Sequence, residues 1–254
     1  MLSSREEYQA MFESEEKLWW YKILHEKILH EITNRFGENK DITILDAGCG
    51  TGGLMSFLLH HGYKNIEGFD FSSDAVSFCL ERNLKVKQID IASFDSEFIN
   101  NSFDVIINND VLYQFEDELI VRAISNMDRK LKPDGILISN NNAFDIFYGT
   151  HDIAVGGVQR FTKTDFEKYL KQTSLKIANY AYWSLFLSPL ILVVRLWQQL
   201  ELKLNLIDKS KIKSDVSVPS NWLNNFFYRI VKIEERVLKN GGFGSSLFLV
   251  MVKK

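Results

Sequence analysis

The chain of 254 residues is poor in cysteine. It contains only Cys49 and Cys79, and neither lies in a C-x-x-C pair or beside a cluster of histidines. This pattern excludes a disulfide framework and predicts neither a zinc site nor any other metal site. The first ten residues, MLSSREEYQA, carry charges where a secretory signal would be apolar. Together these features predict a protein of a reducing compartment, the cytoplasm.

Long apolar runs and an excess of positive charge are also lacking. The most apolar stretch, residues 185–194, is interrupted by Pro189 and followed by Arg195. It therefore falls short of the roughly 20 residues that a membrane-spanning helix requires. The formal net charge of −3 provides no basic field for a polyanion. We therefore expect neither an integral membrane segment nor a nucleic-acid partner.

The stretch from Ile42 to Gly53, ITILDAGCGTGG, is the most informative motif of the chain. A short apolar run is followed by Asp46, by a group of glycines and then by an apolar helical pattern that begins at Leu54. This order predicts a strand, a glycine turn and a helix, in a chain that is 46% hydrophobic and long enough for one α/β domain with an insertion. Glycines suit such a turn because they reach positive φ and let a ligand lie against bare backbone near a helix N-terminus.

The type of ligand is indicated by the residue before the glycines. Gly48, Gly50 and Gly53 also satisfy G-x-G-x-x-G, the dinucleotide fingerprint. However, Asp46 would repel a pyrophosphate, whereas it would attract the sulfonium and ammonium groups of S-adenosylmethionine. The stretch resembles motif I of the class I S-adenosylmethionine-dependent methyltransferases. The resemblance implies this methyl donor as cofactor, and a doubly wound, Rossmann-like sheet of seven strands with a C-terminal antiparallel hairpin and helices on both faces.

The resemblance continues at the ends of the next two expected strands. The sequence GFDFS at 68–72 is similar to the family's G-x-D-x-S, in which the acid accepts hydrogen bonds from ribose hydroxyls. The strand at 85–89 ends in Asp90, at the position where the family's acid accepts from the adenine amino group. Phe71 and Ile91 would enclose the adenine ring. The predicted cofactor-binding residues are Asp46, Gly48, Cys49, Gly50, Gly52, Asp70, Phe71, Asp90, Ile91, Asn108 and Asn109.

The fourth strand, expected from Phe103, leads to the reaction centre in this family. Its exit reads Asn109-Asp110-Val111-Leu112, without the Pro-Pro-aromatic sequence typical of enzymes that methylate nucleobase or glutamine amino groups. Gln114 stands where related small-molecule enzymes often have a histidine, and a glutamine can orient an acceptor but cannot take its proton. The candidate bases are therefore His151, Tyr113 and Asp110, in that order. His151 also has the alternative of an ordinary loop histidine.

An aromatic cluster near the N-terminus predicts contact with the ligands. Trp19, Trp20 and Tyr21 are consecutive, and a helix cannot bury all three on one side because neighbouring residues are turned by about 100°. They either pack on the edge of the domain or cover the cofactor and an apolar acceptor. The predicted acceptor-binding residues are Trp19, Trp20, Tyr21, Gln114 and Tyr148.

The remaining pattern predicts the other elements. We expect a helix over 116–130, a turn over 132–135 and a strand over 136–140, with Asn140, Asn141 and Asn142 leading into the acceptor loop. Residues 148–160 are expected to be irregular, followed by a helix to Gln172 and a strand over 175–182. Residues 191–207 fit either an amphipathic helix or a strand. A polar linker over 209–220, a helix over 222–238 and a final strand over 246–252 complete the prediction.

Four segments follow from this division. Residues 1–40 form a helical lid, 41–182 the cofactor-binding core, 183–240 a helical insertion and 241–254 the final core strand. The insertion serves acceptor binding or lid closure, or packs on the domain or on a partner chain. A subordinate hypothesis is that 185–207 contacts a membrane surface, because an apolar face there accompanies Arg195, Trp197 and Lys203.

The predicted function is methyl transfer from S-adenosylmethionine to an oxygen, nitrogen or carbon atom of a small-molecule or lipid- or glycan-linked acceptor. Two alternatives remain open at this point. One is an NAD(P)-dependent oxidoreductase that uses the same glycines, although no Tyr-x-x-x-Lys pair is evident. The other is a non-catalytic subunit that binds the methyl donor and acts through a partner. The sequence indicates neither the acceptor nor the oligomeric state.

Overall fold

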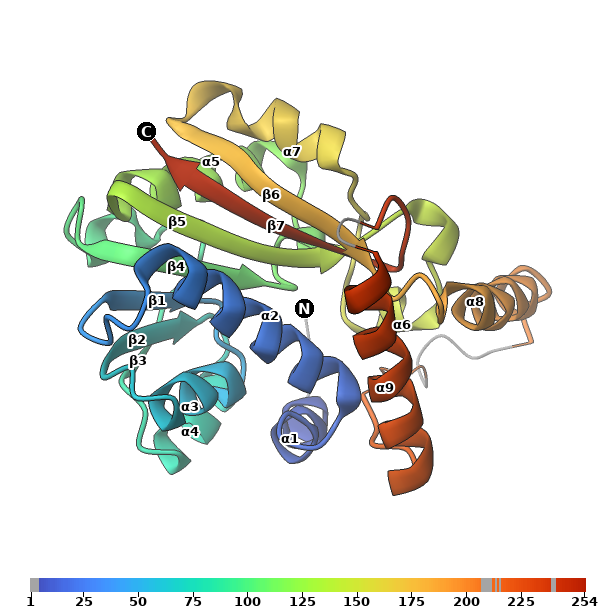
Figure 1. Ribbon diagram of the computed structural model, residues 1–254. Coiled ribbons are helices and arrows are strands. Elements are labelled where there is room, and N and C mark those ends of the chain that lie inside the picture. Colours follow the sequence, from blue (N-terminus) through green and yellow to red (C-terminus); the bar gives the residue numbers. More distant parts are fainter. Residues whose placement is uncertain (1–4, 207–211, 213, 215, 239–240) are drawn as a thin grey trace.

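The computed structural model describes residues 5–206, 212, 214, 216–238 and 241–254. Its centre is a sheet of seven strands in the order β3-β2-β1-β4-β5-β7-β6 (Figure 1). The strands are β1 (Thr43–Ala47), β2 (Asn65–Asp70), β3 (Val86–Gln88), β4 (Phe103–Asn109), β5 (Leu131–Asn142), β6 (Leu175–Trp183) and β7 (Ser246–Lys253). The first five strands are parallel, and β7 lies antiparallel between β5 and β6. The predicted sheet and its C-terminal antiparallel hairpin are confirmed.

Helices cover both faces of this sheet. They are α1 (Arg5–Ser14), α2 (Trp19–Phe36), α3 (Gly53–His60), α4 (Ser73–Glu81), α5 (Asp117–Lys130), α6 (Thr150–Ala154), α7 (Lys163–Tyr169), α8 (Ser188–Lys203) and α9 (Asn221–Val237). Short 3-10 turns are η1 (Phe94–Glu97), η2 (Leu112–Gln114), η3 (Asp145–Phe147) and η4 (Leu170–Gln172). Figure 1 shows α2 and α9 on one side of the sheet and α5 and α7 on the other.

Alternation along the strands divides the core between the two faces. In β4, Val105 and Ile107 pack with α2 and α3, whereas Ile106 packs with α5 and α7. Successive side chains of a strand point to opposite faces, so a continuous apolar run is what a sheet covered on both sides requires. The short apolar runs of the sequence therefore predicted the central strands.

The turn predicted over residues 132–135 is wrong. These residues belong to β5, which already pairs with β4 through Leu131 and Phe103. The register then shifts, so that Val105 pairs with Ile136, and Asp134 takes a φ of +62°. Proline, aspartate and glycine suit this irregularity within a strand as well as they suit a turn between elements. Local composition alone could not separate the two.

The predicted ends of other elements also need correction. Asn140 and Asn141 do not lead into a loop, because β5 continues to Asn142 and both side chains are buried. Residues 148–160, predicted as irregular, contain α6. The ambiguity over 191–207 is resolved as helix up to Lys203, the end of α8. The predicted linker over 209–220 lies in part outside the described residues.

Candidate active site

The carboxyl ends of β1, β2 and β4 border one side of a cavity of about 510 Å³. Its volume lies within the range of small-molecule sites, and it is found where doubly wound sheets bind their ligands. Helices α2, α8 and α9 close it from the other side. The lining includes Glu15, Trp19, Trp20, Tyr21, Asp46, Gly48, Cys49, Gly50, Asp70, Phe71, Asp90, Ile91, Asn109, Asp110, Tyr113, Gln114, His151, Arg160, Ile191, Arg195 and Phe227.

The glycine turn after β1 is held tightly against β2. The backbone N–H groups of Gly48 and Cys49 both donate to the Phe69 carbonyl, at 2.8 and 2.9 Å. Gly48 has a φ of +87°, and a Cβ there would stand 2.4 Å from a methyl carbon of Val111. A side chain at this position is therefore excluded by conformation and by space together. The result is a stretch of bare backbone on the cavity wall.

Asp70 is fixed by the backbone on both sides of it. Its Oδ2 accepts from the Gly50 N–H at 3.0 Å, and its Oδ1 accepts from the Ser72 N–H at 2.9 Å. Burial raises the pKa of this carboxyl, while these hydrogen bonds act in the opposite direction. Asp70 thus ties the glycine turn to the start of α4, and its position at the end of β2 is the predicted one.

The next two strand ends complete this part of the cavity wall. Phe71 is half exposed and Ile91 is buried. The Asp90 carboxyl lies nearby and its Oδ1 accepts from the Ala92 N–H at 2.8 Å. An aromatic ring, an aliphatic side chain and a carboxylate therefore border the same end of the cavity.

The cavity has a strongly acidic character. Burial, with a contribution from the neighbouring Glu15 and Asp70 carboxylates, raises the pKa of Asp46 to about 8. Burial likewise raises the pKa of Glu15 and that of Asp110, each to about 7. Carboxylates crowded into a buried space repel one another and favour a cation between them.

Asp110 lies at the exit of β4 in an unusual conformation. Its φ is +52°, which is uncommon for a residue other than glycine. Asn140 donates from its Nδ2 to both carboxyl oxygens, at 3.3 and 3.1 Å. The Oδ1 of Asn140 accepts in turn from the indole N–H of Trp183 at 2.9 Å. A buried chain of hydrogen bonds thus fixes the orientation of the Asp110 carboxyl.

The structure brings the other two candidate bases to the same cavity. Burial, together with the Asp110 carboxylate, raises the pKa of Tyr113 well above its ordinary value. His151 lies in α6, which the sequence did not predict, and its side chain lines the cavity. Asp110, Tyr113 and His151 therefore line the same cavity, and burial raises the pKa of the Asp110 carboxyl to about 7.

The aromatic cluster at the start of α2 covers the cavity and packs against α9. The Trp19 ring meets Phe227 edge-on at 5.9 Å, and the Trp19 backbone N–H donates to Asn224 of α9. Trp20 stacks on Trp183 at 5.6 Å. Thus α9 and β6 supply partners for Trp19 and Trp20, whereas the Tyr21 ring lies edge-on to Trp20 of the same helix at 5.2 Å.

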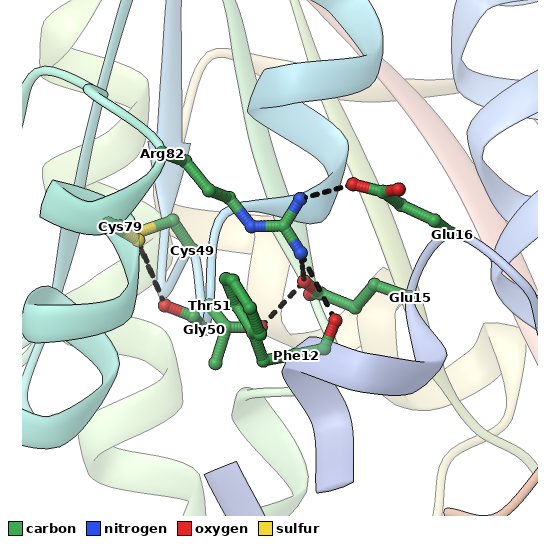
Figure 2. Close-up of polar contacts among 8 residues, drawn as sticks. All are labelled: Phe12, Glu15, Glu16, Cys49, Gly50, Thr51, Cys79 and Arg82. Atoms are coloured by element: carbon green, nitrogen blue, oxygen red, sulfur yellow. Dashed lines mark hydrogen bonds and ion pairs between the residues drawn. The ribbon is translucent and has the colours of Figure 1, made fainter. Parts of the chain in front are cut away.

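The segment between α1 and α2 is connected to the glycine turn by a polar cluster (Figure 2). The buried Glu15 carboxylate accepts from the Thr51 hydroxyl at 2.6 Å. Arg82 approaches the same oxygen at 3.4 Å, and it donates to Glu16 at 2.7 Å and to the Phe12 carbonyl at 3.2 Å. Thr51 lies inside the glycine motif, so this cluster links the N-terminal segment directly to the cofactor loop predicted from the sequence.

Three of the predicted site residues do not line the cavity. Gly52 has a φ of +83° at the start of α3, and a Cβ there would stand 2.3 Å from Leu84, so it serves the turn. Asn108 is buried and donates to the Ala47 carbonyl at 2.6 Å. The Tyr148 hydroxyl approaches the Gly157 carbonyl at 3.4 Å. A strand alternates its faces, so Asn108 and Asn109 cannot both point to the cavity.

Other lining residues were missed by the sequence prediction. Glu15 looks like a solvated acid at the start of a helix, and nothing local marks it as buried. Arg160 lines the cavity while its guanidinium is paired with buried Asp152 through bonds of 2.9 and 3.0 Å. Arg195 and Ile191 reach the cavity from α8. No signal short of the tertiary fold would have found these residues. Among the described residues, no group of three or more His, Cys, Asp or Glu side chains could hold a metal ion.

Comparison with known proteins identifies the family. Residues 38–203 match the family model of a methyltransferase domain. The chain is 29% identical over 185 residues to a ubiquinone biosynthesis O-methyltransferase of Rickettsia bellii, covering 65% of this chain and 75% of that protein.

Solved structures show the same fold. A putative sarcosine dimethylglycine methyltransferase of Galdieria sulphuraria superimposes with a TM-score of 0.61 at 16% identity, over 92% of this chain and 86% of that one. The magnesium protoporphyrin IX methyltransferase of Synechocystis, solved with bound S-adenosylmethionine, gives a TM-score of 0.54 at 16% identity, over 92% and 80% of the two chains. With the family model covering more than half of its length, the chain belongs to the methyltransferase-domain family and is a class I S-adenosylmethionine-dependent methyltransferase.

Proposed function

We propose that this enzyme binds S-adenosylmethionine along the β1, β2 and β3 ends of the cavity and methylates a small acceptor with an apolar body. The observation that carries the proposal is the buried acidic wall next to the glycine turn. A cationic sulfonium and ammonium suit a wall formed by Asp46 and its neighbours, and bare glycine backbone allows a close approach. A dinucleotide pyrophosphate would gain no such attraction, and its charge would oppose ionisation of the same carboxyl groups, which disfavours an NAD(P)-dependent reaction.

The donor-binding roles follow the order of the strand ends. Gly48, Cys49, Gly50 and Asp46 would hold the methionine part. Asp70 would accept from the ribose hydroxyls, since each carboxylate oxygen can accept more than the one backbone hydrogen bond it already has.

The adenine would lie at the next strand end. Phe71 and Ile91 would enclose its ring, and Asp90 would accept from its amino group. Asn109 would lie on the side of the reaction centre, while Gly52 and Asn108 would support the turn and the strand behind it.

The bound donor supplies an activated methyl group, so the chain's own task is positioning, exclusion of water and proton transfer. Good alignment alone can contribute several kcal/mol, up to about 7–11 in model reactions. We assign proton removal from the acceptor to Asp110, because its pKa of about 7 suits a general base at neutral pH. Asn140 would hold the carboxyl in place, and His151 and Tyr113 would contact the acceptor.

The acceptor side of the cavity is rich in apolar surface. Trp19, Trp20, Ile191 and Phe227 line it, and the guanidinium of Arg160 is neutralised by Asp152. An acceptor with an aromatic or aliphatic body fits such a wall. The named O-methyltransferase relative supports an acceptor hydroxyl, whose proton must be removed before or during transfer.

Calorimetric titration with S-adenosylhomocysteine, with NADH in parallel, tests the cofactor assignment. We expect binding of S-adenosylhomocysteine alone, weakened in the Asp70→Ala variant. Binding of NADH alone would overturn the proposal. Turnover of an acceptor by the isolated chain would exclude a non-catalytic donor-binding role.

A further inference from the structure

Helix α8 has the reverse polarity of an ordinary surface helix, with polar contacts on the side of the protein and apolar side chains on the side of the solvent. Polar residues of its middle turns face the protein: Gln198 accepts from the Thr150 N–H at 3.4 Å and from Arg195 at 2.8 Å, and Gln199 donates to the Tyr148 carbonyl at 2.7 Å. Most of its apolar residues face outward. The exposed set is Leu190, Val193, Val194, Leu196, Trp197 and Leu200, continued by Leu204 directly after the helix.

This exposed set forms a continuous stripe. Leu190, Val193, Trp197, Leu200 and Leu204 follow the three- and four-residue spacing of one helix face. Val193 is 66% exposed and Trp197 62% exposed, so the rest of the domain covers less than half of either residue. Apolar patches of this kind mark interaction surfaces rather than ordinary solvent-facing surface.

The small size of the stripe favours a lipid surface over a second protein chain. Figure 1 shows α8 at the edge of the molecule, away from the sheet. A helix of 16 residues offers a footprint of only about 24 Å by 10 Å, well below the roughly 800 Å² per partner of a stable protein interface. The charges near the stripe balance, because exposed Lys203 is offset by partly exposed Glu201, four residues after Trp197 on the same helix face.

We propose that the apolar stripe of α8 inserts into the surface of a lipid bilayer, with Trp197 at its centre. The helix would lie in the plane of the interface and bury its apolar side chains among the acyl chains. No helix in the described part of the chain is long and apolar enough to cross a membrane. The contact is therefore peripheral and reversible.

This orientation brings the membrane to the mouth of the active-site cavity. The opposite face of the same helix supplies Ile191 and Arg195 to the cavity lining. An acceptor dissolved in the bilayer would need to pass only one helix to reach Asp110. This step rests on the proposed methyltransferase function and specifies its acceptor as a membrane-dissolved lipid, whereas the docking surface itself does not depend on it.

Flotation with vesicles of phosphatidylcholine and phosphatidylglycerol tests the docking. The full chain is compared with a Val193→Asn/Trp197→Asn double variant and with a matched control, Ile233→Asn/Val237→Asn. The control residues are also exposed apolar residues on a helix, at 52% and 66% in α9. We expect the full chain to float with the vesicles, the α8 variant to lose at least about tenfold in partitioning, and the α9 control to match the full chain.

Two further measurements separate the alternatives. Binding of S-adenosylhomocysteine, measured in all three proteins, shows whether the variants are folded and tests the methyltransferase proposal separately. Light scattering gives the oligomeric state. Failure of the full chain to float, or equal flotation of the α8 variant, overturns the proposal. So does a dimer that the α8 substitutions convert to a monomer, because it assigns the stripe to a second copy of the chain.

Discussion

At the scale of single residues, the site depends on acids that the fold keeps away from water. Asp46 has its pKa raised to about 8 because it is buried beside other carboxylates. The ordinary pKa of an aspartate is 3.8, so at neutral pH the ligand-free protein holds a proton there that a cationic ligand would displace. Binding and ionisation are therefore linked.

We expect S-adenosylmethionine to bind more tightly as the pH rises from 6 toward 8, and to release protons on binding at pH 7. The physical reason is that the cation lowers the pKa of Asp46. Calorimetry in two buffers of different ionisation enthalpy measures the released protons. In the Asp46→Asn variant the proton release should fall, and an unchanged release would show that another group is responsible.

Asp110 is the second residue whose environment matters for chemistry. Replacement by asparagine keeps the shape but removes the proposed base, and we expect kcat to fall about 10²–10⁴-fold for an acceptor that loses a proton. In the unmodified enzyme, kcat/KM should rise with pH to a plateau above about pH 7, and this limb should vanish in the Asp110→Asn variant. Steady-state rates across pH, with Tyr113→Phe as a control that leaves the limb in place, provide the measurement.

At the scale of elements, no sequence pattern indicated the polar contacts that connect the segment between α1 and α2 to the glycine turn. The buried Glu15 carboxylate links Thr51 of the turn to Arg82 at the end of α4. We propose that this cluster holds the N-terminal segment closed over the donor site. Its parts lie far apart in the chain, so no local pattern could indicate it.

Replacing Thr51 by valine removes a hydroxyl donor from a buried carboxylate. We expect α1 to detach more often, at a cost of about 1–3 kcal/mol, and the affinity for S-adenosylhomocysteine to fall. Limited proteolysis of residues 5–18, followed by mass spectrometry, measures the detachment. The Glu16→Gln variant is the matched control, because Glu16 is 69% exposed and its contact with Arg82 is screened by solvent. Equal protection of all three proteins would contradict the closing role.

The elements also show what sequence reasoning can and cannot reach. The strand end that bears Asp46 was predicted because an apolar run, an acid and a glycine turn occur together within a few residues, whereas Asp70 and Asp90 were predicted from expected strand ends that resemble those of the family. The α8 helix was left undecided because its leucines alternate near Leu200 and Leu202 while the rest follows a helical period. The burial of Asn140 was missed, since its partners Asp110 and Trp183 are 30 and 43 residues away.

At the scale of the whole molecule, the buried acids affect stability. The folded pKa values of Asp46, Glu15 and Asp110 lie above their ordinary values of 3.8 to 4.5. The folded protein thus retains protons that the unfolded chain has lost, and stability declines as pH rises toward 8. His25 acts at lower pH: its burial lowers its pKa to about 3, so stability is lost as pH falls below 6.5.

Of the four groups named above, the three acids are the ones that act above pH 6.5, so we expect the Tm of the ligand-free protein to fall between pH 6.5 and pH 8. The Asp46→Asn variant should show a smaller fall because the asparagine cannot ionise. S-adenosylmethionine should raise the Tm more at pH 8 than at pH 6.5, because it stabilises the ionised carboxylates. Calorimetric scans at both pH values, with and without ligand, measure these differences. A Tm that rises from pH 6.5 to pH 8 would contradict the assignment.

The position of β7 has a consequence for the newly made chain. This strand is the last of the seven in the sequence, yet it pairs with β5 on one side and with β6 on the other. Until it has emerged from the ribosome, β5 and β6 expose unpaired edges and a share of both apolar faces. We therefore expect a chain truncated before residue 246 to be prone to aggregation through these two edges.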